Sequence, residues 1–98
     1  MGTFCQLFKR YRLRAEFETL TKFGHALAKE GRVYDDSLFT MWQNGKRTPK
    51  DRKLVLTIIK IFIERGGINS IEEANEFMAS TGLGFLTTQE NQIIPQLT

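Results

Sequence analysis

Residues 37–49 read SLFTMWQNGKRTP, and this stretch fixes where one helix ends and where the chain must turn. Phe39 and Trp42 are three positions apart, so a helix carries both on one face and leaves the polar residues beside them on the others. Gly45 follows this pattern, and glycine is the usual residue just past a helix end. Pro49 cannot continue the helix. The stretch therefore predicts a short amphipathic helix followed by a basic turn.

Helical spacing also dominates the rest of the chain. Phe4, Leu7, Phe8 and Tyr11 follow the i, i+3, i+4, i+7 pattern of one helix face, and the other face is expected to carry Lys9, Arg10, Arg12 and Arg14. The segment over 51–65 is apolar on most of its circumference, which predicts a helix buried on two sides. The predicted helices lie around residues 4–14, from Thr19 to Gly31, over 35–44, over 51–65, and from Ser70 to Gly82.

These elements predict an all-α fold, a compact bundle of about five helices in one domain over residues 1–86. From Thr87 the chain becomes polar and aperiodic, so residues 87–98 are predicted to form a flexible tail. The apolar residues expected to cover the core in the last helix and behind it are Ile71, Ala74, Phe77, Met78, Leu83, Phe85 and Leu86.

Charge is distributed unevenly along the chain. All fourteen Lys and Arg lie in residues 1–65, which carry a net +7, whereas residues 66–98 carry −4. A basic body favours a polyanionic partner, and an unevenly charged solvated surface is the alternative. The cations are densest over residues 46–53, where they repel one another unless phosphates or water screen them. These cations are Lys46, Arg47, Lys50, Arg52 and Lys53.

Little in the sequence supports catalysis. His25 is the only histidine, and Cys5 is the only cysteine, so no internal disulfide can form. There is no Ser/His/Asp set, phosphate-cradling glycine loop or metal-ligand spacing. No segment is long and apolar enough to span a bilayer. We therefore expect a cytoplasmic protein that is not an enzyme and that needs no cofactor or metal.

Around residues 37–49 the chain resembles the Cro/repressor-type (Xre) helix-turn-helix domains, and the resemblance covers roughly residues 3–65. The family's pattern contains an aliphatic residue, Ser or Thr, Trp, Glu or Gln, Gly, a basic pair and Pro. The chain between Gly24 and Trp42 is longer than in typical members, and Leu20 stands where members often carry Gln. The matching positions are Phe39, Thr40, Trp42, Gln43, Gly45, Lys46, Arg47 and Pro49.

The resemblance implies a lambda-repressor-like core that binds double-stranded DNA sequence-specifically, as a prokaryotic transcriptional regulator. Helix 35–44 would enter the major groove and loop 46–53 would meet phosphates. Trp42 is expected in the core, and helix capping explains Asp36 and Ser37 equally well. The implied base contacts are Asp36, Ser37, Leu38, Thr40, Met41 and Asn44. The implied phosphate contacts are Thr19, Gln43, Lys46, Arg47, Lys50, Arg52 and Lys53.

A second interpretation stays open, in which the chain is an N-terminal interaction or adaptor module of a larger multidomain regulator such as a signalling NTPase. The segment after Gly66 loosely resembles one that follows such domains in some large bacterial regulators. In this adaptor interpretation the protein contacts would be Leu38, Met41, Ile93 and Ile94.

Members of the Cro/repressor-type family often form homodimers on DNA. If this chain does so, the surface of the fifth predicted helix together with residues 83–86 would be the dimer interface.

Overall fold

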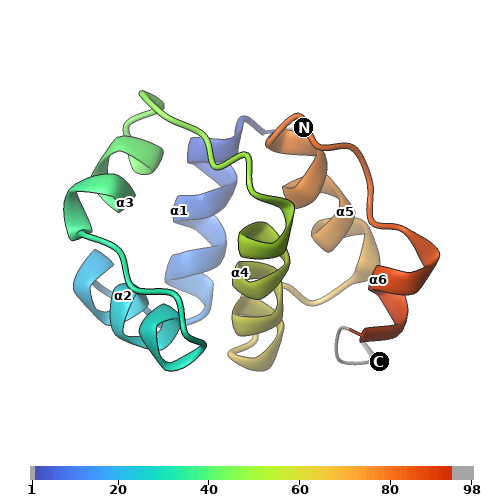
Figure 1. Ribbon diagram of the computed structural model, residues 1–98, viewed down its shortest axis with the longest axis horizontal. Coiled ribbons are helices and arrows are strands. Elements are labelled where there is room, and N and C mark those ends of the chain that lie inside the picture. Colours follow the sequence, from blue (N-terminus) through green and yellow to red (C-terminus); the bar gives the residue numbers. More distant parts are fainter. Residues whose placement is uncertain (1, 94–98) are drawn as a thin grey trace.

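Every regular element in the computed structural model, which describes residues 2–93, is a helix. Figure 1 shows α2 and α3 at one end of the molecule, α4 in the centre, and α5 and α6 at the other end. The all-α prediction is confirmed, and each of the five predicted helices is present. The helices are α1 (Phe4–Arg14), α2 (Leu20–Lys29), α3 (Asp36–Gln43), α4 (Arg52–Glu64), α5 (Ile71–Ser80) and α6 (Thr88–Ile93).

Side-chain caps set the starts of helices α2 to α5. The hydroxyl of Thr19 accepts a hydrogen bond from the backbone N–H of Lys22 at the start of α2. Asp35 and Asp51 cap α3 and α4 in the same way. Ser70 accepts from the backbone N–H of Glu73 in α5. Because each cap satisfies an N–H that the helix leaves free, the short polar residues before the apolar runs determine where the helices begin.

Helix α4 lies in the middle of the core, packed against α2 on one side and α5 on the other. Ile58, Ile59 and Phe62 are fully buried, which confirms the prediction of a helix covered on two sides. Aromatic rings join the remaining helices around it. The rings of Phe8, Phe23, Trp42 and Phe77 lie within contact distance of one another or of Phe62. Large rings of this kind bury much apolar area per residue, which suits a chain of this length.

The link between α4 and α5 crosses closely over the end of α1. Gly67 is buried there, and a Cβ at this position would overlap the backbone oxygen of Tyr11 and lie 2.9 Å from the Cβ of Ala15. Only a residue without a side chain fits this crossing. The Gly66–Gly67 pair therefore ends α4 and also allows α1 and α5 to pack together.

Three predicted side-chain environments are wrong. Arg12 is predicted on the solvent face of the first helix, but it is only 4% exposed. Phe85 was assigned to the core, but it is 67% exposed, while its neighbour Leu86 is buried. Ile71, in the first turn of α5, is also exposed. The other members of that apolar face, Ala74, Phe77 and Met78, are fully buried.

Within the segment predicted as a flexible tail, residues Thr88–Ile93 form helix α6. The backbone N–H of Thr87 donates to Glu90 Oε1, and the backbone N–H of Glu90 donates to Thr87 Oγ1. This reciprocal pair is a capping box, which starts a helix without any apolar stripe. Residues 94–98, including the predicted contact Ile94, lie outside the described residues. Among residues 2–93, no helix has the length and apolar character needed to cross a membrane.

Candidate nucleic-acid interface

Helix α3 has a buried face and an exposed polar face. Phe39 and Trp42 point into the core, where their ring centroids are 5.3 Å apart. Ser37, Thr40 and Asn44 are exposed on the outside. The two aromatic residues therefore anchor the helix in the core while these three polar residues remain exposed on the surface. Trp42 is a core residue, as predicted.

The start of α3 is tied to the start of α2. The Thr21 hydroxyl donates a hydrogen bond of 2.6 Å to Asp36 Oδ2, and the Thr40 hydroxyl donates to the backbone oxygen of Asp36. The Asp36 carboxylate therefore has an intramolecular role that holds α2 and α3 together. This intramolecular contact accounts for an Asp at position 36 without any contact to a DNA base. The Asp35 carboxylate, one residue earlier, is the N-cap of the helix.

The end of α3 positions the first two cations of the basic loop. Gly45 has φ of +77°, the backbone N–H of Lys46 donates to Met41 O at 2.9 Å, and Gly45 N–H donates to Trp42 O. This pattern is a Schellman motif, in which a left-handed glycine lets the chain fold back over the last turn. The Arg47 N–H also donates to Met41 O. The backbone of Lys46 and Arg47 is thus fixed at the end of α3, and both residues are exposed.

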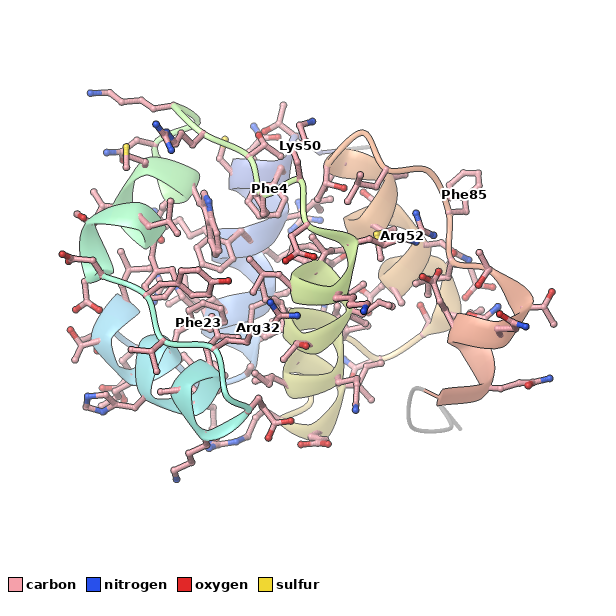
Figure 2. The ribbon with its side chains drawn as sticks, viewed as in Figure 1. Phe4, Phe23, Arg32, Lys50, Arg52 and Phe85 are labelled. Atoms are coloured by element: carbon pink, nitrogen blue, oxygen red, sulfur yellow. The ribbon has the colours of Figure 1, made fainter. Side chains whose placement is uncertain are left out.

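The other cations of the loop have different surroundings. The Arg52 guanidinium donates to Glu90 and to the backbone oxygens of Leu83 and Phe85. The Lys50 ammonium donates to the backbone oxygen of Thr81, at the end of α5. Figure 2 shows Arg52 between α4 and the segment that follows α5, with Lys50 above it. These two residues, predicted to contact phosphates, instead hold the segment after α5 in place.

Gln43, another predicted phosphate contact, lies beside the buried Arg12. Arg12 Nη2 donates to Gln43 Oε1 at 2.9 Å and Nη1 donates to the backbone oxygen of Phe17 at 2.6 Å, while its Nε has no partner among the described residues. Burial without a carboxylate lowers the pKa of Arg12, because desolvation disfavours its charged form. The amide oxygen of Gln43 is therefore occupied, which leaves its NH2 group for any external contact.

The remaining predicted contacts are divided between surface and core. Thr19 and Lys53 are exposed, whereas Met41 is half-buried. Leu38 is half-buried and packs against the core, which leaves only part of its side chain for either predicted contact. The structure therefore brings together an exposed surface at α3 and the loop after it. This surface, named the α3 surface below, consists of Ser37, Thr40, Asn44, Lys46 and Arg47.

The sequence contained signals for the two arginine contacts that were missed. Arg12 follows Phe4 and Phe8 at intervals of four, so it continues the buried stripe of α1. Thr87 and Glu90 have capping-box spacing, which predicts the helix that carries the partner of Arg52. Within residues 2–93, His, Cys, Asp and Glu side chains form no group of three or more that could hold a metal ion.

Comparisons with family models, with curated proteins and with solved structures find no match to this chain.

Proposed function

We propose that this chain binds double-stranded DNA, with α3 in the major groove and the loop after it on the phosphate backbone. The observation that carries this proposal is the α3 surface, in which an exposed polar helix face ends at two cations whose backbone is fixed by the same helix. The major groove of B-DNA admits one α-helix, and phosphate contacts at its end set the position of that helix.

The roles proposed for single residues follow their surroundings. Lys46 and Arg47 are exposed and have no carboxylate partner among the described residues, so they are proposed as phosphate anchors. Thr40 and Asn44 are proposed to reach base edges, because Ser/Thr hydroxyls and Asn amides hydrogen-bond to bases. Lys50 and Arg52 are left out of the proposed interface, since their charged groups bind the chain itself.

The overall charge supports the same proposal. Residues 1–65 carry the whole positive charge of the chain, and they contain both α3 and the loop. A positive body attracts a polyanion from any direction, whereas the α3 surface gives that attraction a defined orientation. We therefore propose the wider role of a prokaryotic transcriptional regulator of the Cro/repressor type, acting at the nucleoid in the cytoplasm.

The experiment is a selection of preferred sequences from a random duplex library, repeated with variants. Thr40→Ala and Asn44→Ala are expected to change the preferred sequence at about one or two base pairs, with a loss of roughly 1–3 kcal/mol on the original site. Thr57→Ala is the matched control, because the Thr57 hydroxyl donates to the backbone oxygen of Lys53 in α4 as that of Thr40 does to Asp36 in α3. A folded protein that enriches no duplex sequence at low salt would refute the proposal.

A further inference from the structure

Phe85 is an exposed aromatic side chain on a backbone that is firmly held. It is 67% exposed, more than any large apolar residue except Val33 in the described chain. Arg52 donates to its backbone oxygen at 2.7 Å and to that of Leu83 at 2.6 Å. The next residue, Leu86, is buried, and its N–H donates to Asn75 Oδ1 at 2.9 Å. Figure 2 shows the Phe85 ring pointing away from the helices.

This arrangement differs from that of an ordinary exposed apolar residue. Exposed side chains on loose segments must be ordered when a partner binds, and ordering costs free energy. The backbone around Phe85 is already ordered by Arg52 and by Asn75. An aromatic residue presented in this way has the properties of an interface hot spot, which is a rigid apolar anchor that fills a pocket on its partner.

The surface around Phe85 is acidic and hollowed. One hollow of about 310 Å³ is lined by Phe85 with Glu72, Asn75 and Glu76. A second, of about 290 Å³, lies between Phe85, Glu76 and the Ala79–Ser80 end of α5. Neither Glu72 nor Glu76 forms an ion pair among the described residues. Glu76 Oε1 accepts a hydrogen bond from the backbone N–H of Gly2 at 3.3 Å, which leaves its second oxygen for a partner.

The geometry points to a docking surface for a protein segment in which Lys or Arg residues flank an apolar side chain. Phe85 would supply the apolar anchor, and Glu72 and Glu76 would face the cations of the partner. Complementary charge of this kind selects the partner and speeds its association. This surface, named the Phe85 surface, shares no residue with the α3 surface, and it contains none of the residues that the sequence predicted for an adaptor.

A second copy of the chain is a poorer occupant of the Phe85 surface. A two-fold dimer brings the same patch of both copies together. Glu72 and Glu76 would then lie close to their own equivalents, and like charges at an interface oppose association. The homodimer predicted to use this face is therefore not the partner that we propose for the Phe85 surface.

The test uses a random peptide display library as the probe and the folded chain as the target. Peptides retained by the wild-type chain are expected to carry at least one aliphatic or aromatic residue next to two or more Lys or Arg. Phe85→Ala should weaken their binding by about tenfold or more, the loss expected for a hot-spot residue. Glu72→Gln with Glu76→Gln should weaken binding and reduce its dependence on salt.

Two controls separate docking from folding and from DNA binding. Leu13→Ala removes another exposed apolar side chain, 49% exposed on α1, and should leave peptide binding unchanged. Lys46→Ala with Arg47→Ala should also leave it unchanged. If Phe85→Ala does not fold, the paired glutamine variant alone decides the result, since both carboxylates are on the surface of α5.

Several results would overturn the inference. The first is that no peptide is enriched, and the second is that the enriched peptides lack cations. The third is equal binding to the wild type and to Phe85→Ala. Sedimentation showing a dimer that Phe85→Ala dissociates would assign the surface to a second copy instead. If bound duplex DNA shields the Phe85 side chain from solvent, the Phe85 surface belongs to DNA, which also contradicts the inference.

Discussion

Arg52 Nε lies 2.6 Å from Glu90 Oε2, and this pair joins the start of the central helix α4 to the last helix α6. Arg52 Nη2 donates to the second carboxylate oxygen at 2.7 Å, so the contact has two parallel hydrogen bonds. The Glu90 side chain is only 13% exposed. The hydrogen bonds from Arg52 hold the pKa of Glu90 at about 2. A cation predicted to meet phosphate is thus part of the protein's own framework.

Replacing Arg52 with Ala should destabilise the fold by about 1–3 kcal/mol, because it removes charge-assisted hydrogen bonds and leaves Glu90 without its cation. The Arg52 side chain is 31% exposed, so water recovers part of the loss. The measurement is the free energy of unfolding in urea, monitored by circular dichroism. Lys53→Ala is the matched control, since Lys53 is the neighbouring exposed cation and should change stability by less than about 0.5 kcal/mol. Equal effects of the two variants would contradict the proposed role of Arg52.

Glu90 should make stability depend on pH in the acid range. Its pKa in the folded chain, about 2, lies below the value of about 4.3 in an unfolded chain. Its stabilising contribution is therefore complete above about pH 4.3 and is lost as the pH falls toward 2. The free-energy difference between the wild type and Glu90→Gln should be constant from about pH 5 to neutrality and should shrink below that range. A difference that does not vary between pH 5 and 2 would contradict this role.

The two adjacent glycines after α4 should respond differently to substitution. Gly67→Ala should destabilise by about 2 kcal/mol or more, because the new Cβ overlaps the backbone oxygen of Tyr11. Gly66→Ala should cost only about 1–2 kcal/mol, since Gly66 has φ of +79° but nothing lies within 4 Å of its added Cβ. Thermal unfolding of both variants compares the two costs. If Gly66→Ala lowers the stability more than Gly67→Ala does, the close crossing over α1 is not the reason that position 67 requires glycine.

Gln43→Glu should stabilise the fold by about 1 kcal/mol. The new carboxylate would face the buried Arg12, which has no carboxylate partner among the described residues. It would turn a hydrogen bond between a cation and a neutral amide into an ion pair. Asn44→Asp is the control, because it adds the same charge at the exposed next residue without reaching a buried cation. Urea unfolding should show a gain for the first variant and no gain for the second. Destabilisation by Gln43→Glu would show that Arg12 does not need an anionic partner.

The sequence predicted the helices well because their signals are local. Thr19 and Ser70 cap the helices for which they were proposed, and the apolar stripe of α4 correctly indicated burial on two sides. Gly45 ends α3 as predicted, since its left-handed backbone depends only on neighbouring residues. Helix α6 was missed because a six-residue helix has room for a capping box but not for an apolar period.

The candidate site was less predictable, because its composition depends on contacts between distant parts of the chain. Arg52 and Lys53 are adjacent cations in sequence, yet within residues 2–93 only Arg52 meets a carboxylate, 38 positions away. Phe85 and Leu86 are both large apolar residues, yet Leu86 is buried and Phe85 is exposed on a backbone held by Arg52 and Asn75. Charge and hydropathy patterns cannot distinguish such pairs.

The most direct test of DNA binding through the α3 surface is the salt dependence of duplex affinity for two variants that lose the same charge. Lys46→Ala with Arg47→Ala removes both proposed phosphate anchors, and Lys29→Ala with Lys60→Ala removes two cations elsewhere on the chain. The logarithm of affinity should fall with the logarithm of salt concentration, with a slope of about 0.9 per phosphate contact. The first variant is expected to weaken binding to all duplexes and to lower the slope by about 2. The second variant is expected to leave the slope nearly unchanged. Equal losses from the two variants, or no duplex binding by the folded wild-type chain at low salt, would show that the α3 surface does not bind DNA in this way.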